Sequence, residues 1–203
     1  MSRIVNSVTL LYIIMLWPGR HSIWGLFEAD WYYPWMMYES GIWSIRLLIL
    51  TVAVTPTLKL INRLGKGRAF GRWLLQRRRH FGLASFIFGA AHLIHYVLET
   101  NSLRFMLTDI LALEFAVGWL GFVIFAALAV TSNNWSIRYL GRTWKTLHLW
   151  VYPAAALTFL HWYLFDEFTG RVLYWLAILV GVKLIHGLLM LIPRIGKQGA
   201  SQT

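Results

Sequence analysis

Apolar residues gather in six stretches along the chain, separated by polar and charged segments. Each stretch holds about 19–23 residues, and a helix of that length, rising about 1.5 Å per residue, crosses a hydrocarbon layer of roughly 30 Å. The pattern therefore predicts an all-α integral membrane protein, a six-helix transmembrane bundle in a single domain. The stretches cover residues 4–26, 42–60, 80–98, 110–130, 145–165 and 172–192.

The residues that interrupt or separate these stretches also predict local structure. Pro18 interrupts the first stretch, so this segment either crosses the membrane with a kink or stops short and lies at the interface. After it, "EADWYYPWMMYES" (residues 28–40) is expected to form an aromatic interfacial loop. In the basic segment 59–80, Gly65-Lys66-Gly67 is expected to form a flexible turn.

The composition agrees with a membrane protein. Hydrophobic residues make up 58% of the chain and charged residues 13%, whereas an ordinary soluble domain carries about 25% charged residues. Twelve Trp, twelve Phe and nine Tyr suit aromatic belts at two membrane interfaces. The chain has no cysteine, which excludes disulfides, iron–sulfur clusters and thiolate metal sites.

The distribution of charge predicts the orientation. With six spans, the eight acidic residues fall in or near the three loops on one side, and fifteen of the nineteen Lys and Arg fall on the other. An excess of Lys and Arg marks the cytoplasmic side, so both termini are expected in the cytoplasm of a bacterial inner membrane. This topology accounts for most of the basic residues without nucleic-acid binding. The fifteen are Arg3, Lys59, Arg63, Lys66, Arg68, Arg72, Arg77, Arg78, Arg79, Arg138, Arg142, Lys145, Lys183, Arg194 and Lys197.

Histidine is the residue type that suggests chemistry. Ionisable side chains inside a membrane are rare and usually functional, and burying an unpartnered polar group costs roughly 2–7 kcal/mol. The seven histidines lie in or at the edge of predicted spans, so they need partners. The seven are His21, His80, His92, His95, His148, His161 and His186.

Histidines on the third and fifth spans lie at two matched depths. Both spans run from inside to outside, His80 is level with His148 near the cytoplasmic boundary, and His92 or His95 is level with His161 in the outer half. Imidazole pairs on facing helices can hold haem, and bis-histidine ligation suits electron transfer. The layout predicts one or two b-type haems between these spans.

The sequence leaves several assignments of individual histidines and arginines open. His80 also fits an interfacial histidine in water, and only one of His92 and His95 need bind iron. His148 and His161 are thirteen residues apart, so on a straight helix their side chains would point in directions about 220° apart. Pro153 between them can bend the helix and change this angle. Arg79 and Arg142 are candidate partners for haem propionates. His21 and His186 have no matched partner and are read as structural.

Three segments resemble the ferric-reductase-like transmembrane family over residues 40–190: "SGIWSIRLLILTVAVTPTLKL", "RRRHFGLASFIFGAAHLIHYVLE" and "LGRTWKTLHLWVYPAAALTFLHWYL". By this resemblance His92, His148 and His161 match the family's haem-linked histidines, whereas His80 and His95 are not clearly family positions. The resemblance also implies that electrons pass from a cytosolic flavin reductase through b-type haem to a periplasmic molybdopterin enzyme that reduces oxidised methionine. The resemblance also implies FMN as a second cofactor besides haem.

The chain itself offers no complete catalytic site. No G-x-G-x-x-G motif follows a strand, so the electron donor and acceptor are expected to be separate proteins. The basic segment that begins at Arg63 and includes Arg77–Arg79 can steer an acidic donor or bind a flavin phosphate, besides setting the topology. Two other functions stay open: a quinone-linked cytochrome b subunit, and a non-haem transporter with a histidine proton relay.

Overall fold

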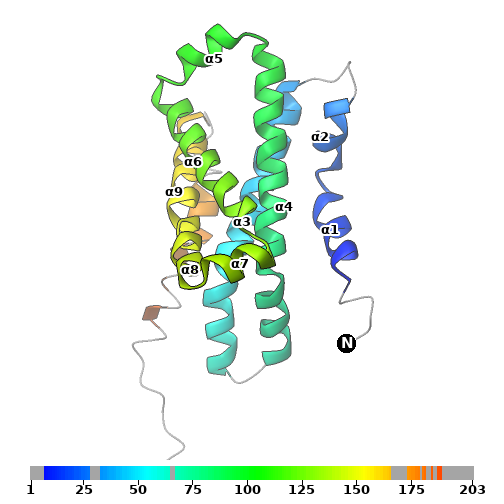
Figure 1. Cartoon of the computed structure of the whole chain (residues 1–203), viewed down its shortest axis with the longest axis vertical. Helices are drawn as coiled ribbons and strands as arrows, with labels where there is room; N and C mark the ends of the chain where they lie inside the picture. The colour runs from blue at the N-terminus through cyan, green and yellow to red at the C-terminus, as the bar shows by residue number, and fades with distance from the viewer. Residues whose placement is uncertain are drawn as a thin grey trace, which may run out of the picture.

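The computed structural model describes residues 7–27, 33–64 and 67–165, together with residues 173–178, 180, 181, 184, 187 and 188. Figure 1 shows long helices side by side, with short helices joining their ends. Within the described residues the regular structure is all helical, as predicted. The elements are α1 Val8–Leu16, α2 Arg20–Trp24, the 3-10 helix η1 Gly25–Phe27, α3 Tyr33–Leu64, α4 Arg68–Thr100, α5 Leu103–Asp109, α6 Leu113–Val130, α7 Asn134–Leu140, α8 Arg142–His148 and α9 Val151–Phe165.

Three of the described helices are long and apolar enough to cross a membrane. They are α3, α4 and α6, and they contain most of the predicted spans 42–60, 80–98 and 110–130. About half of the predicted sixth span, 172–192, lies outside the described residues, so the count of six stays a prediction. Residues 173–178 are helical, and Trp175 packs against Ile45 and Phe159.

The first apolar stretch is broken at Pro18, as expected. Helix α1 ends at Leu16, and α2 begins at Arg20 after a turn. The turn lies close to the long helices, because a Cβ on Gly19 would come within 2.6 Å of Phe88 and of Trp43. The nine residues of α1 rise only about 14 Å, which is less than the hydrocarbon thickness.

The expected aromatic loop at residues 28–40 is wrong for its second part, because residues 33–40 form the first turns of α3. Residues 28–32 lie outside the described part. Pro34 sits in the first turn, where a missing N–H breaks no helical hydrogen bond, and no helix breaker follows it closely. Met36 is buried, and a Cβ on Gly25 of η1 would lie 3.1 Å from its sulfur.

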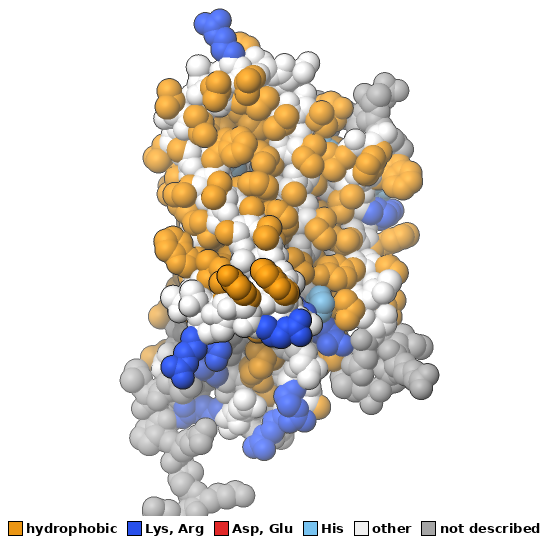
Figure 2. Space-filling view, in the orientation of Figure 1, with side chains coloured by type: hydrophobic (Ala, Val, Ile, Leu, Met, Phe, Trp, Pro, Cys, Tyr) orange, Lys and Arg blue, Asp and Glu red, His pale blue; other side chains and the backbone are white. Residues whose placement is uncertain are grey.

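The basic segment 59–80 is helical at residues 59–64 and 68–80, where a loop was expected. Helices α3 and α4 are 32 and 33 residues long, or about 50 Å. Of the predicted turn Gly65-Lys66-Gly67, residues 65 and 66 lie outside the described part, and Gly67 has φ +73°. The basic ends of the two helices therefore extend past a hydrocarbon layer of about 30 Å. Leu, Arg, Lys and Gln favour helix over this stretch. Figure 2 shows Lys and Arg gathered at this end, below a broad apolar band.

Small polar residues join α3 to α4 in the most extensive helix pair of the structure. The hydroxyl of Ser44 donates to the Ser85 carbonyl (3.0 Å), and the hydroxyl of Ser85 donates to the Ser44 carbonyl (2.7 Å). Close approach through small residues is typical of membrane helix pairs. The second large pair, α6 and α9, packs against the first through Leu48, Val52 and Leu128, among others. Side chains thus fill the half of the bundle nearer the basic end.

Candidate functional site

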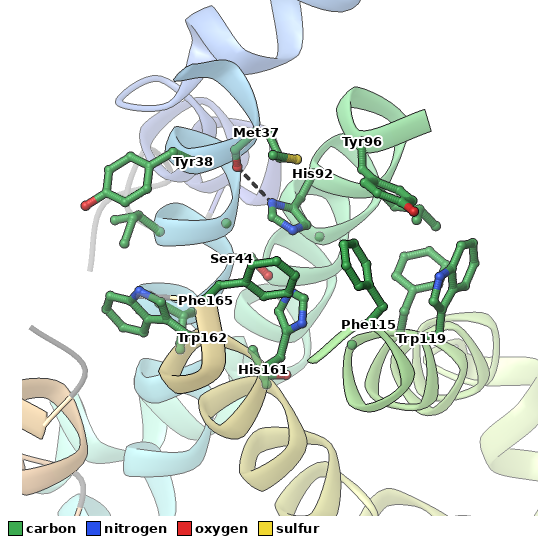
Figure 3. Close-up of a pocket in the computed structure, with 18 of the residues that line it drawn as sticks. Met37, Tyr38, Ser44, His92, Tyr96, Phe115, Trp119, His161, Trp162 and Phe165 are labelled. Carbon is green, nitrogen blue, oxygen red and sulfur yellow. Dashed lines mark hydrogen bonds between the residues drawn. The ribbon is translucent and has the colours of Figure 1, made fainter. Parts of the chain in front are cut away.

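A cavity of about 560 Å³ lies between α3, α4, α6 and α9, in the half of the bundle away from the basic ends of α3 and α4. Its volume falls within the roughly 300–1,000 Å³ of small-molecule and cofactor pockets. Most of its lining is apolar or aromatic, which suits a large flat ring system. The aromatic members include Tyr38, Tyr96, Phe115, Trp119, Phe122, Phe125, Trp162 and Phe165. Figure 3 shows Tyr38, Tyr96, Phe115, Trp119, Trp162 and Phe165 around the two histidines of the lining.

The two histidines of the cavity come from different helix pairs. His92 lies on α4 and His161 on α9, with ring centroids 6.0 Å apart and ring planes at 90°. An imidazole nitrogen bonds a metal ion such as Zn²⁺ at about 2.0–2.1 Å, so two imidazoles on opposite sides of one ion have centroids roughly 6 Å apart. The observed separation fits one metal ion between the rings.

Backbone carbonyls set the direction of both rings. His92 Nδ1 lies 2.8 Å from the carbonyl oxygen of Met37, and His161 Nδ1 lies 2.7 Å from that of Glu114. A carbonyl only accepts, so each Nδ1 carries the proton and donates it, which leaves the lone pair on Nε2. Metal-ligating histidines are usually held in this way by their second ring nitrogen.

His148 has other partners. It ends α8, where its Nδ1 donates to the Trp144 carbonyl (3.1 Å) and its ring stacks on Trp144 at 3.8 Å between centroids. Its Nε2 lies 3.3 Å from the hydroxyl of Ser132, in the segment after α6. The helix is interrupted at residues 149–150, just before Pro153, so His148 and His161 do not share one straight axis.

His80 and His95 both face the N-terminal helices. His80 Nδ1 lies 3.1 Å from the hydroxyl of Tyr12 on α1. His95 is fully buried, and its Nε2 lies 2.6 Å from the Ser22 carbonyl in α2. Neither lines the cavity, so the structure brings together only the outer pair, His92 with His161. His21 lies on α2 outside the cavity lining, and His186 lies outside the described residues.

Basic side chains do not line this cavity in the described part of the chain. Arg79, expected near a propionate, donates to the side-chain oxygen of Asn134 (2.8 Å), and Arg142 is exposed at the start of α8. The rim of the cavity near α5 carries acidic residues instead, Glu99 and Asp109. Asp109 there accepts a hydrogen bond of 3.0 Å from the hydroxyl of Tyr96.

Two glycines of the lining were not singled out from the sequence. Gly41 lies against the ring of His92, and Gly118 lies against the ring of His161. Their importance depends on which helix packs beside them, and glycines are common in membrane spans. The sequence shows only that Gly118 lies inside the predicted span 110–130 and that Gly41 directly precedes the predicted span 42–60.

Comparisons with known proteins agree on one family. The family described as "ferric reductase like transmembrane component" matches residues 40–159. The chain is 38% identical over 166 residues to the "protein-methionine-sulfoxide reductase heme-binding subunit MsrQ" of Brucella ovis, covering 71% of each chain. The same subunit of Brucella anthropi is 36% identical over 160 residues, covering 68% of this chain and 69% of the relative. No solved structure matches.

The family match covers more than half of the chain, including His92 and His148, and the matched relatives are covered over more than two thirds of their length. The resemblance seen in the sequence motifs is thereby confirmed. The chain belongs to the ferric-reductase-like transmembrane family.

Proposed function

We propose that this chain is a b-type cytochrome membrane subunit, which relays electrons from a cytosolic flavin and NAD(P)H reductase through haem to a periplasmic acceptor. The acceptor is a molybdopterin methionine sulfoxide reductase of the MsrP type. The observation that carries the proposal is the pair His92 and His161, whose ring centroids lie 6.0 Å apart in an aromatic cavity and whose Nδ1 atoms each donate to a carbonyl. The similarity to MsrQ subunits supports it.

The residues of the cavity fit haem in three ways. Two imidazoles alone make a weak metal site, whereas a porphyrin supplies the remaining ligands of iron. The aromatic lining would pack against a flat apolar ring and would shield a metal at its centre from water. Two histidine ligands leave no open position for oxygen or substrate, which suits electron transfer. When bound there, haem supplies a one-electron redox centre.

The protein contributes position and environment. His92 and His161 would hold the iron from helices of two different pairs, and the carbonyls of Met37 and Glu114, by accepting from Nδ1–H, leave the lone pair of each ring on Nε2. His148 is a further ligand candidate at the inner level, where it would have to leave Trp144 and Ser132.

The basic end of α3 and α4 is proposed to face the cytoplasm and to dock the donor or the phosphate of FMN. Exposed Arg68 and Arg72 lie at this end. The chain would then sit in the bacterial inner membrane with both termini in the cytoplasm, and the cavity would lie nearer the periplasm. This places the redox centre on the side of the final acceptor.

The test is the visible spectrum of purified protein together with the ratio of haem to protein. Sharp α and Soret bands on reduction and at least one haem per chain are expected. A protein without these bands would exclude the cytochrome and favour a transporter. Reduction by quinol alone, with no response to a flavin donor, would favour a quinone-linked subunit.

A further inference from the structure

Each histidine of the cavity rests against a glycine of a neighbouring helix. A Cβ on Gly118 would lie 2.6 Å from Nδ1 and 2.8 Å from Cε1 of His161, closer than real Cβ atoms come to other atoms. A Cβ on Gly41 would lie 3.0 Å from Nδ1 and 3.3 Å from Cε1 of His92, which is tighter than almost all real contacts. The rings therefore occupy space that a side chain at either position would take.

The same glycines expose the carbonyls that the histidines use. Met37 precedes Gly41 by four residues, and Glu114 precedes Gly118 by four. In an α-helix, residues i−4 and i lie one above the other on one face, and the carbonyl of i−4 accepts from the N–H of i. Without a Cβ at i, the flank of that carbonyl is open to a second donor. Glycine and carbonyl together form a slot for one imidazole.

The slot occurs twice in the same arrangement. In each helix pair the first helix, α3 or α6, provides the glycine and the carbonyl, and the second helix, α4 or α9, provides the histidine. Both first helices run toward the basic end and both second helices run away from it (Figure 1). Two unrelated stretches of sequence thus build one half of the site each.

We propose that Gly41 and Gly118 are positioning residues of the haem site, which seat His92 and His161 so that each Nδ1–H donates to a backbone carbonyl and each Nε2 faces the metal. The inference rests on the proposed function, because it concerns the same two ligands. Donation from Nδ1–H makes Nε2 a stronger electron donor, which favours ferric iron and lowers the midpoint potential.

The experiment compares Gly118→Ala and Gly41→Ala with two glycine controls. A Cβ on Gly121, one turn from Gly118, would make only ordinary contacts from 3.4 Å upward, and so would a Cβ on Gly82 at 3.6 Å. Gly121→Ala and Gly82→Ala are therefore expected to keep the haem content and the midpoint potential. Gly118→Ala is expected to weaken haem binding by roughly 10–100-fold and to raise the midpoint potential of the remaining haem, with a smaller effect for Gly41→Ala.

A double-mutant cycle keeps the test valid if Gly118→Ala folds poorly. In a His161→Ala background the added methyl meets no imidazole, so Gly118→Ala should have no further effect on the thermal unfolding of the haem-free protein. An equal loss of stability with and without His161 would show that Gly118 serves helix packing alone and would overturn the proposal.

The readouts separate this inference from the proposed function. If His92→Ala and His161→Ala both keep full haem, the ligand assignment fails, whatever the glycines do. If the histidine variants lose haem but Gly41→Ala and Gly118→Ala match their controls in haem affinity and midpoint potential, only the positioning role is overturned.

Discussion

At the scale of single residues, the direction of a histidine side chain decides its role. His92 and His95 stand three residues apart on α4, yet His92 lines the cavity and His95 bonds to α2. Their depths in the membrane are almost equal, so depth alone does not distinguish them. The position around the helix axis does, because α9 packs on one side of the bundle and the N-terminal helices on another.

Replacing a cavity histidine tests the ligand pair. His92→Ala or His161→Ala is expected to remove the haem held in the cavity, because one imidazole cannot keep the six-coordinate site. Haem content and the reduced spectrum measure the loss. His95→Ala serves as the control and should retain haem. Loss of haem with His95→Ala but not with His92→Ala would transfer the ligand role to His95.

A different result is expected at the inner level. His148→Ala should affect only a second, more cytoplasmic haem and should leave the haem of the cavity in place. The measurement is the haem-to-protein ratio, falling from two to one if the second haem exists. If His148→Ala abolishes the same haem as His161→Ala, then His148 belongs to the cavity site in the functional protein.

At the scale of elements, the two hydroxyl bonds between α3 and α4 hold the largest helix pair together. Ser44 and Ser85 are buried, and each donates to the other's carbonyl. In a membrane such bonds contribute about 0.6 kcal/mol each and at most about 1.7. The small size of the two serine side chains contributes more to stability than the hydrogen bonds do, since a hydroxymethyl group lets the helices lie close.

If close packing matters more than the hydrogen bonds, two substitutions of Ser85 should lower stability by different amounts. Ser85→Ala should lower the free energy of unfolding by roughly 0.6–1.7 kcal/mol, whereas Ser85→Leu adds volume to a packed contact and should cost about 1–3 kcal/mol more. Unfolding in mixed detergent micelles measures both. Ile94→Ala, at a 44% exposed position on the same helix, is the control and should change little. Equal stability of the Ala and Leu variants would refute the close-packing account.

The sequence predicts spans better than it predicts their ends. Hydropathy locates the membrane part of α3, α4 and α6, but it treats the basic residues 59–80 as loop, although Arg and Lys are good helix formers. The matched depths of histidines identify the outer pair. They do not identify the partners of His148, because the helix break at residues 149–150 turns this side chain toward Trp144 and Ser132. The glycine slots depend on contacts between distant segments, and spacing within one segment does not reveal them.

At the scale of the whole molecule, charge separates the two ends. Figure 2 shows a group of Lys and Arg side chains gathered below the apolar band, and the cavity lies toward the other end. Exposed Arg68 and Arg72 near the start of α4 are open to a protein partner. Arg77 is less suited, because its guanidinium lies 5.8 Å from the ring centre of Trp73.

Charge reversal at this end tests donor docking. Arg68→Glu and Arg72→Glu should slow haem reduction by a cytosolic flavin reductase without changing haem content, and the wild-type rate should fall as salt rises, since exposed charges are screened within about 8–10 Å at 0.1–0.15 M. Stopped-flow reduction in oriented proteoliposomes measures both rates. Arg104→Glu on α5, at the opposite end, is the control. Salt-independent rates would exclude electrostatic docking here.

The two histidines of the site belong to different helix pairs, α3–α4 and α6–α9, so they are synthesised and inserted into the membrane at different times. The ribosome adds about 5–20 residues per second, so α4 is complete seconds before α9 emerges. During that interval a growing chain offers only one of the two imidazoles, and stable cofactor capture must wait until the second hairpin has inserted and docked. Once captured, the cofactor ties the early half of the protein to the late half, and its binding free energy adds to the stability of their association. Haem supply after synthesis would then decide how much of the newly made protein survives membrane quality control.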